Sequence, residues 1–115
     1  MHFPRILVVE DDLALRYIIC EVLRDGELEV VEVGSADEAF HYLKTINRID
    51  LVFTDVNTPG SMDGIALANA LAAEFPLVKV VITSGRPPPV PLDPIPFIPK
   101  PYAVFGVLET IRATL

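Results

Sequence analysis

With 115 residues, of which 51% are hydrophobic, the chain is long enough for one domain with its own core, and we expect a single domain over residues 1–115. The net charge of −7 comes without a basic stripe, which argues against direct contact with nucleic acid, and no apolar run is long enough to span a membrane. One cysteine cannot form an intramolecular disulfide, and a strand-like run that starts at Arg5 leaves no room for a signal peptide, so we expect a cytoplasmic protein.

The first third of the chain alternates between strand-like and helix-like segments. RILVVE, at residues 5–10, is a short β-branched run typical of a fully buried strand. Residues 13–25 carry apolar side chains at helical spacing, with Ile18 on the predicted buried face, and Gly26 is expected to stop this helix. Residues 28–33 alternate apolar side chains with glutamates, which favours a more exposed edge strand.

The middle of the chain continues this alternation. Ser35 and Glu38 form a capping box that opens a second helix. DLVFT, at residues 50–54, is predicted to be a third strand. Asp63 can cap a third helix, which we expect from about residue 64 to residue 75.

The last third contains two more strands and a final helix, separated by a proline-rich stretch. Residues 78–83 and 97–98 are the predicted strands, and residues 102–114 form the helix, with Phe105 in its buried stripe. Residues 87–101 include eight prolines in fifteen positions. Because proline lacks an amide donor and clashes with the preceding turn, this stretch should be extended rather than helical. It is either a rigid shortcut or a docking segment for a partner.

Four separated pieces of the chain place polar groups at or just past the ends of these predicted strands. They are the acidic run at residues 10–12, Asp55, Ser84 and the pair Lys100-Pro101. Strands that alternate with helices imply βαβ units and a parallel sheet, so all four pieces should meet at the carboxyl edge of that sheet. Taken singly, each piece also fits a helix cap, a turn or a surface charge, and Asp12 is expected to be a cap. Their ordered occurrence indicates a site for phosphoryl transfer.

The residue types at this edge suit that chemistry. Glu10, Asp11 and Asp55 would repel one another unless a cation lies between them, and hard oxygen ligands with open positions suit Mg²⁺. A carboxylate such as Asp55 can also act as a nucleophile and form an aspartyl-phosphate. Lys100 can place a positive charge on one phosphate oxygen, and Ser84 can donate a hydrogen bond to another.

The motifs ILVVEDD, TDVNTPGSMDG, ITSG and PKP stand in an order that resembles the receiver domain of two-component response regulators, over the whole chain. The resemblance implies that Asp55 is the phosphoacceptor. It implies a Mg²⁺ site made by the acidic pair Glu10 and Asp11, by Asp55 and by the backbone carbonyl of Asn57. Such a domain catalyses its own phosphorylation and dephosphorylation and is not a multiple-turnover enzyme on small substrates.

The resemblance also implies a fold and a partner. The fold is a flavodoxin-like, doubly wound, five-stranded parallel sheet of order 2-1-3-4-5, with helices on both faces. Ser84 is the hydroxyl that turns towards the phosphoryl group, Lys100 is the lysine that contacts it, and the Lys100–Pro101 bond is expected to be cis. The phosphoryl donor is a histidine kinase or a histidine phosphotransfer protein. We expect a stand-alone receiver that signals through protein contact, unless an effector domain has been removed.

Three departures from the family's pattern stand out. The loop after Asp55 is one residue longer, through Gly60-Ser61. The switch aromatic falls on Phe97, which has no hydroxyl to donate. The stretch from Ser84 to Lys100 is shorter than in the family, by about six residues, and is filled with prolines, so the family's fourth helix is expected to be missing or reduced.

Two alternative functions remain open from the sequence. One is a protein-binding scaffold that keeps the acidic pocket but works without phosphorylation. The other is a phosphohydrolase of the haloacid dehalogenase type, because the stretch from Asp55 to Thr58 loosely matches the nucleophile motif of that family, although Asn57 stands where its second acid should be.

Overall fold

The computed structural model describes residues 3–45, 48–88 and 91–115. The strands are β1 (Arg5–Val9), β2 (Glu29–Val33), β3 (Leu51–Asp55), β4 (Lys79–Ser84) and β5 (Phe97–Pro99). The helices are α1 (Leu13–Asp25), α2 (Ala36–Thr45), α3 (Gly64–Glu74) and α4 (Val104–Thr114). All paired strands run parallel, in the order β2-β1-β3-β4-β5. The predicted flavodoxin-like sheet is therefore confirmed.

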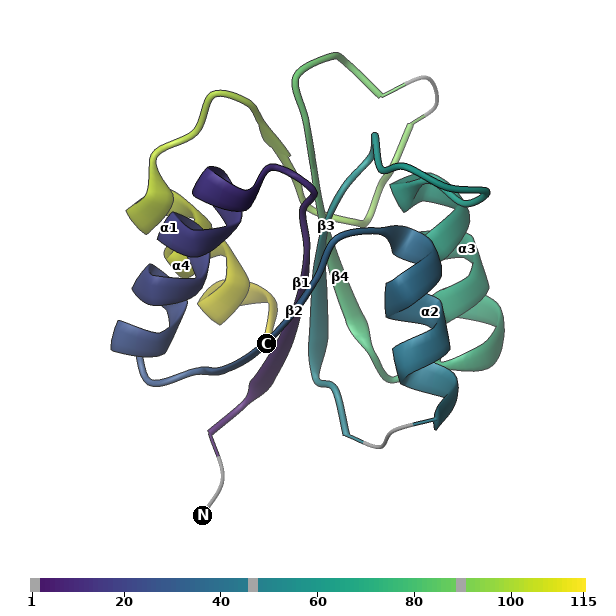
Figure 1. The fold of residues 1–115 in the computed structure, drawn as a ribbon, viewed down its shortest axis with the longest axis horizontal. Helices are drawn as coiled ribbons and strands as arrows, with labels where there is room; N and C mark the ends of the chain where they lie inside the picture. The colour runs from purple at the N-terminus through teal and green to yellow at the C-terminus, as the bar shows by residue number, and fades with distance from the viewer. Residues whose placement is uncertain (1–2, 46–47, 89–90) are drawn as a thin grey trace.

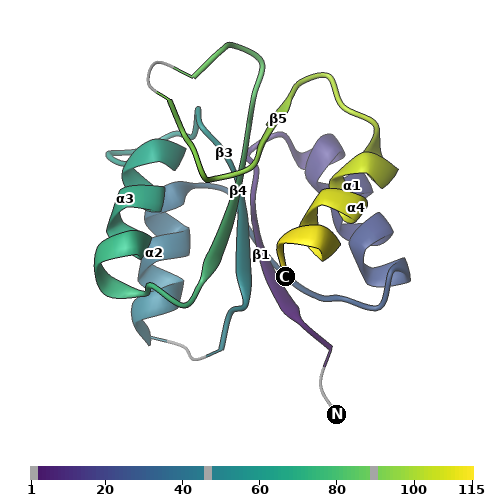
Figure 2. The same ribbon diagram turned by 180° about the vertical axis from the view of Figure 1, so that it is seen from behind.

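The sheet lies between two helical layers. Figures 1 and 2 show α1 and α4 on one face and α2 and α3 on the other. Side chains of a strand alternate between faces, and β1 divides its apolar residues accordingly. Ile6 and Val8 pack with α1 and α4, while Leu7 and Val9 pack with α2 and α3. Burial of β1 on both faces explains why its sequence reads as one continuous apolar run.

Helix starts follow the caps that the sequence suggested. Asp12 caps α1 by accepting a hydrogen bond from the amide of Leu15, and Asp63 caps α3 by accepting one from the amide of Ala66. At the start of α2, the amide of Glu38 donates to the Ser35 hydroxyl, as in a capping box. These caps fix where the helices begin beside the ends of β1, β2 and β3.

Two details of the packing differ from the sequence prediction. Ile18 and Phe105 are exposed, whereas the buried residues of their helices are Ile19, Cys20 and Leu23 in α1 and Val107, Leu108 and Ile111 in α4. Helix α1 ends at Gly26, as predicted, and the residue after it, Glu27, is in the left-handed region with φ of 66°. Gly26 also lets α4 approach closely, because a Cβ there would lie 2.8 Å from a methyl group of Leu108.

The connection from β4 to β5 forms no helix in its described parts, residues 85–88 and 91–96, which we call the β4–β5 segment. Its apolar side chains Leu92 and Ile95 pack, together with Phe97, against the buried cluster formed by Val56, Ala68 and Ile82. The prediction that the family's fourth helix is missing or reduced is thus confirmed over these residues, and Pro89 and Val90 lie outside the described part. The Lys100–Pro101 peptide bond is cis, as expected. Over the described ranges, none of the helices has the length and apolar character needed to cross a bilayer.

Candidate functional site

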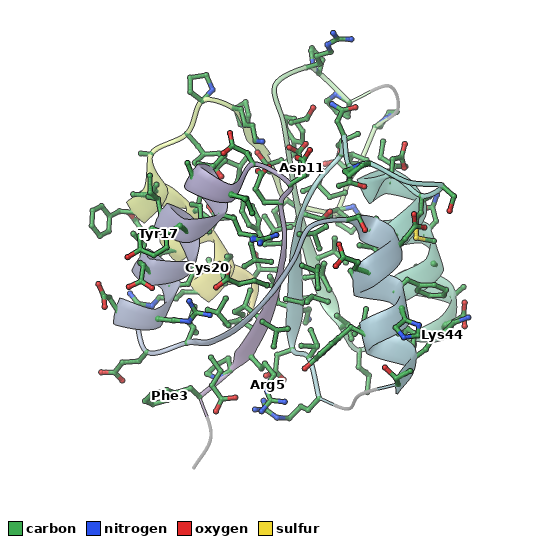
Figure 3. The ribbon with its side chains drawn as sticks, viewed as in Figure 1. Phe3, Arg5, Asp11, Tyr17, Cys20 and Lys44 are labelled. Carbon is green, nitrogen blue, oxygen red and sulfur yellow. The ribbon has the colours of Figure 1, made fainter. Side chains whose placement is uncertain are left out.

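The polar residues singled out in the sequence stand at one edge of the sheet. Asp55 and Ser84 are the last residues of β3 and β4, and Glu10 and Lys100 directly follow β1 and β5. These strands run parallel, so their carboxyl ends lie at the same edge. Figure 3 shows Asp11 at this end of β1 and Arg5 at the opposite end.

Lys100 joins two of the acidic residues. Its Nζ lies 2.9 Å from Oε1 of Glu10 and 2.5 Å from Oδ2 of Asp55. Glu10 is 5% exposed and Asp55 is 7% exposed, whereas 23% of the Lys100 side chain remains open to solvent. Two carboxylates removed from water therefore share one partly exposed cation, and charge-assisted hydrogen bonds of this kind are stronger than those between neutral groups.

The protonation state of Lys100 follows from this geometry. Burial alone would lower the pKa of Lys100, but hydrogen bonds to Asp55 and Glu10, together with their negative charges, outweigh burial and raise it above its ordinary 10.5. Lys100 is therefore positively charged at neutral pH and balances one of the two carboxylates. The group of Lys100, Glu10 and Asp55 as a whole therefore remains net negative, which favours the binding of an additional cation at this edge.

The second oxygen of each carboxylate is held by the backbone. Oδ1 of Asp55 accepts a hydrogen bond of 3.1 Å from the amide of Asn57, and Oε2 of Glu10 accepts one of 3.1 Å from the amide of Asp12. Both carboxylates are thus fixed in orientation by a lysine on one side and an amide on the other. Asn57 and Asp11 are exposed and lie within two residues of these anchored side chains.

Ser84 and Phe97 lie on the strands beside this pair. Ser84 is 3% exposed, and its hydroxyl accepts a hydrogen bond of 3.2 Å from the amide of Arg86. Its carbonyl accepts a hydrogen bond of 2.9 Å from the amide of Lys100, which ties the end of β4 to the lysine. Phe97 is half-buried and lies opposite Ile82 in the sheet. Among the hydrogen bonds of the described residues, none joins the Ser84 side chain to Glu10, Asp11 or Asp55.

The donor set fits Mg²⁺ by its chemistry. Within the described ranges, no three acidic, histidine or cysteine side chains are already gathered around one point. What the structure does gather is Glu10 and Asp55, with the exposed Asp11 following Glu10. Hard carboxylate oxygens beside an open surface, where water can complete the shell, are what Mg²⁺ prefers. The residues therefore fit the metal that the sequence predicted.

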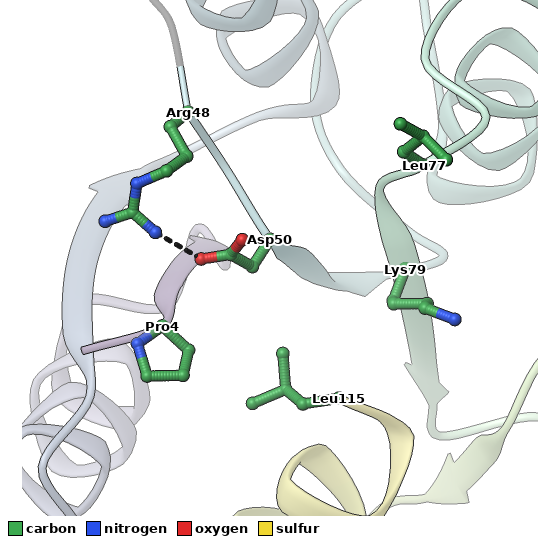
Figure 4. A pocket seen from close by; sticks show the side chains of 6 residues that line it. All are labelled: Pro4, Arg48, Asp50, Leu77, Lys79 and Leu115. Carbon is green, nitrogen blue, oxygen red and sulfur yellow. Dashed lines mark hydrogen bonds and ion pairs between the residues drawn. The ribbon is translucent and has the colours of Figure 1, made fainter. Parts of the chain in front are cut away.

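A second polar cluster lies at the opposite edge of the sheet. Figure 4 shows a pocket there lined by Pro4, Arg48, Asp50, Leu77, Lys79 and Leu115. Arg48 and Asp50 form an ion pair of 2.6 Å within it. The amino ends of the parallel strands meet at this edge, where the strand topology places none of the candidate site residues. We therefore keep the carboxyl edge as the candidate site.

Two residues near the site were not assigned a role from the sequence. Tyr102 packs edge-on against Phe53 with ring centroids 6.2 Å apart, and its buried hydroxyl has no hydrogen-bond partner among the described atoms. Asp37, at the start of α2, binds the loop that follows Asp55 through Ser61. The inserted Gly60-Ser61 marks this loop in the sequence, but no sequence signal identifies Asp37 as its partner.

Replacing Tyr102 with phenylalanine is expected to leave stability at neutral pH unchanged or to raise it by up to about 1 kcal/mol, because a buried hydroxyl without a partner contributes nothing. Burial and the nearby charge of Glu10 raise the pKa of Tyr102 to about 12. The wild type should therefore lose stability as the pH rises from 10 towards 12, and the variant should lose less. Urea unfolding across this range measures both effects. A large loss at neutral pH would mean that the hydroxyl has a partner.

The fold and the site define an α/β domain with a lysine-bridged acidic corner at the carboxyl edge of its sheet. The family model described as the response regulator receiver domain matches residues 6–89 of the chain. The chain belongs to this family. Its role therefore lies in two-component signalling.

Individual relatives agree with this assignment. The regulatory protein VirG of Agrobacterium fabrum is 28% identical over 116 residues, which cover 96% of this chain and 45% of VirG. The chain spans less than half the length of the first curated relatives that it matches. The receiver domain of the hybrid histidine kinase CckA superposes with a TM-score of 0.81 at 30% identity, over 96% of this chain and 98% of that one.

One further solved structure shows the same fold at lower identity. The response regulator TrrA of Thermotoga maritima, solved in complex with Mg²⁺-BeF, superposes with a TM-score of 0.85 at 22% identity. The match covers 98% of this chain and 100% of that one. At this identity the likeness concerns the fold.

Proposed function

We propose that Asp55 accepts a phosphoryl group from the phosphohistidine of a histidine kinase or a histidine phosphotransfer protein, in a Mg²⁺-dependent reaction in the cytoplasm. The modified chain then signals through a changed surface for protein contact. The observation that carries this proposal is the corner in which Lys100 holds Asp55 and Glu10 together at the sheet edge. Family membership favours this function over the haloacid dehalogenase alternative.

Mg²⁺ would be held by Asp11, Asp55 and the backbone carbonyl of Asn57, with Glu10 completing the acidic pair. When bound, it supplies positive charge that offsets the negative charge on the phosphoryl oxygens during transfer. The remaining work falls to the protein's own side chains, which position the nucleophile and the donor.

Asp55 is the nucleophile of the transfer step. One of its carboxylate oxygens attacks the phosphorus in line with the phosphorus–nitrogen bond of the donor. The new oxygen–phosphorus bond forms as the phosphorus–nitrogen bond breaks, and its electron pair returns to the imidazole nitrogen. The amide of Asn57 and the Nζ of Lys100 fix the carboxylate before the attack. Lys100 then contacts one phosphoryl oxygen, and the backbone amides after Asp55 complete the cradle.

The signal ends by hydrolysis of the aspartyl-phosphate. Water attacks the phosphorus, the bond to the Asp55 oxygen breaks, and inorganic phosphate leaves as the carboxylate is restored. Each chain therefore carries one modification at a time, and the site does not turn over small phosphate esters.

Signalling uses residues next to the phosphoryl group. The Ser84 hydroxyl leaves the amide of Arg86, to which it is bonded in this structure, and donates to a phosphoryl oxygen. Phe97 follows by changing its rotamer. Both residues flank the β4–β5 segment, so the surface that changes includes this segment. Phosphorylation shifts the equilibrium between two existing surface states. The size of the shift is the difference between the interaction free energies of the phosphoryl group in the two states.

Acetyl phosphate, with and without Mg²⁺, tests this proposal. We expect a single phosphoryl group per chain by intact mass, formed only with Mg²⁺ and lost slowly, and changes in the amide NMR spectrum centred on Asp55, Ser84 and Lys100. Multiple turnover on generic phosphate esters would instead identify a hydrolase. Mg²⁺ binding without any modification, by either acetyl phosphate or a phosphoramidate donor, would identify a scaffold that works without phosphorylation.

A further inference from the structure

The loop that follows the phosphoacceptor, residues 56–63, is held at its tip by the start of α2; we call it the β3–α3 loop. Oδ2 of Asp37 accepts a hydrogen bond of 2.7 Å from the amide of Ser61, and Oδ1 accepts one of 2.8 Å from the Ser61 hydroxyl. Thr58 adds a third link, since its hydroxyl oxygen accepts a hydrogen bond of 3.3 Å from the amide of Ala36. The Asp37 carboxylate therefore accepts hydrogen bonds from both the amide and the hydroxyl of Ser61.

The inserted Gly60 has no side chain and therefore leaves room for the Asp37 carboxylate. Gly60 has φ of 104°, a conformation that strains residues with a side chain. A Cβ at Gly60 would also lie 2.1 Å from Oδ2 of Asp37, which is far inside contact distance. Hydrogen bonds from the Ser61 hydroxyl, and then from the amides of Ser61 and Met62, lower the pKa of Asp37, so the carboxylate stays charged at neutral pH. Gly60, Ser61 and Asp37 thus form one unit.

The other end of the loop is held against the phosphoacceptor itself. The amide of Gly64 donates a hydrogen bond of 2.8 Å to the carbonyl of Val56. A Cβ at Gly64 would lie 2.2 Å from the carbonyl oxygen of Asp55, so α3 begins in direct contact with the backbone of β3. Asn57 therefore lies in the part of the loop between two fixed points, the contact of Gly64 with β3 and the hydrogen bonds of Ser61 to Asp37.

We propose that Asp37 is a positioning residue of the phosphoryl-transfer site: it fixes the lengthened β3–α3 loop so that the backbone of Asn57 is presented to Mg²⁺ beside Asp55. This inference rests on the function proposed above. A loop with one extra residue has more conformations. If Mg²⁺ binds only one of these conformations, its apparent affinity falls in proportion to the population of that conformation. The hydrogen bonds from Ser61 to Asp37 keep the population of the metal-binding conformation high.

Mg²⁺ titrations followed by amide NMR test the role of Asp37. In D37A we expect the dissociation constant for Mg²⁺ to rise about tenfold, as is typical when a residue that supports a metal ligand is lost. D37N should recover most of the affinity, because its carbonyl can accept from the Ser61 amide and its NH₂ can donate to the Ser61 hydroxyl. Without Mg²⁺, the Ser61 amide should exchange its hydrogen faster in D37A than in the wild type.

Glu38 offers a matched control. It lies in the same first turn of α2, and its carboxylate contacts Gly34 and Ser35 rather than the β3–α3 loop. E38A should therefore keep the wild-type affinity for Mg²⁺ within about twofold. An equal loss of affinity in E38A would overturn the inference, since the effect would then come from the helix or from negative charge in general.

A second variant covers the case in which D37A does not fold. G60A keeps Asp37 but places a methyl group where its carboxylate lies, so it should lose Mg²⁺ affinity in the same way. Wild-type affinity in either D37A or G60A, in a chain that binds Mg²⁺ and accepts a phosphoryl group, would overturn this inference alone. A wild-type chain that fails to bind Mg²⁺ at all would overturn the proposed function and the inference together.

Discussion

Replacing Asp55 with asparagine is expected to abolish labelling by acetyl phosphate while leaving the fold intact. The amide side chain has nearly the same shape, and its oxygen can still accept the hydrogen bond from the Asn57 amide. It is not a nucleophile towards phosphorus, so the loss should be complete within the sensitivity of intact mass measurement. Peptide mapping of the wild type should place the phosphoryl group on Asp55 alone.

Asp25 provides a control for this change. It is an exposed aspartate at the end of α1, away from the carboxyl edge of the sheet. D25N should be labelled as the wild type is, with the same requirement for Mg²⁺. Labelling of D55N at another residue would contradict the role given to Asp55, and loss of the native amide spectrum would show that this side chain is needed for folding.

Replacing Lys100 with alanine is expected to destabilise the metal-free protein and to weaken its response to phosphate. The change leaves Glu10 and Asp55 buried without their shared cation. We expect a loss of about 2 kcal/mol, below the roughly 3–5 kcal/mol typical of fully buried pairs, because Lys100 is 23% exposed. The raised pKa of Lys100 keeps this contribution complete below pH 10.5 and removes it as the pH rises through the higher folded value.

Urea unfolding with and without Mg²⁺ measures this effect. A divalent cation at the acidic pair supplies the charge that Lys100 no longer provides, so Mg²⁺ should narrow the difference in unfolding free energy between K100A and the wild type. The variant should still bind Mg²⁺ but should show smaller NMR changes with beryllium fluoride, a mimic of the phosphoryl group. Lys79, at the amino end of β4, is the control, and K79A should change neither property. A loss of Mg²⁺ affinity in K100A greater than in D11A would contradict the assigned roles.

The fold could be predicted from the sequence because its local signals agree with one another. The apolar run before Glu10 has no helical period, and the segment after Asp12 does, so the change from strand to helix is visible in the chain itself. The caps Asp12 and Asp63 then set helix starts to within a residue or two. Agreement among spacing, caps and breakers is what makes such a sequence readable.

The errors fall where tertiary packing decides. A helical stripe is wider than the contact that buries it, so Ile18 and Phe105 fit the apolar period and still face solvent. The sequence identified Gly26 as the end of the first helix but not its closeness to α4, where a Cβ at Gly26 would lie 2.8 Å from a methyl group of Leu108. No local pattern carries that information, because Leu108 is far away in the sequence.

The site divides in the same way. That Glu10, Asp55 and Lys100 share one edge follows from their positions after parallel strands. That Lys100 bonds to both carboxylates at once, and that Asp37 grips Ser61, depends on the three-dimensional course of loops. The inserted Gly60-Ser61 marked the place in the sequence without naming its partner.

The β4–β5 segment has a consequence for the thermodynamics of the whole domain. Proline restricts the backbone in the unfolded chain as well as in the folded one, so residues such as Pro87 and Pro96 surrender little freedom when the domain forms. Leu92 and Ile95 nevertheless pack against the apolar cluster of Val56, Ala68 and Ile82. This proline-rich connection therefore joins β4 to β5 and covers part of the core at a smaller cost in conformational entropy than a flexible segment of the same length would have.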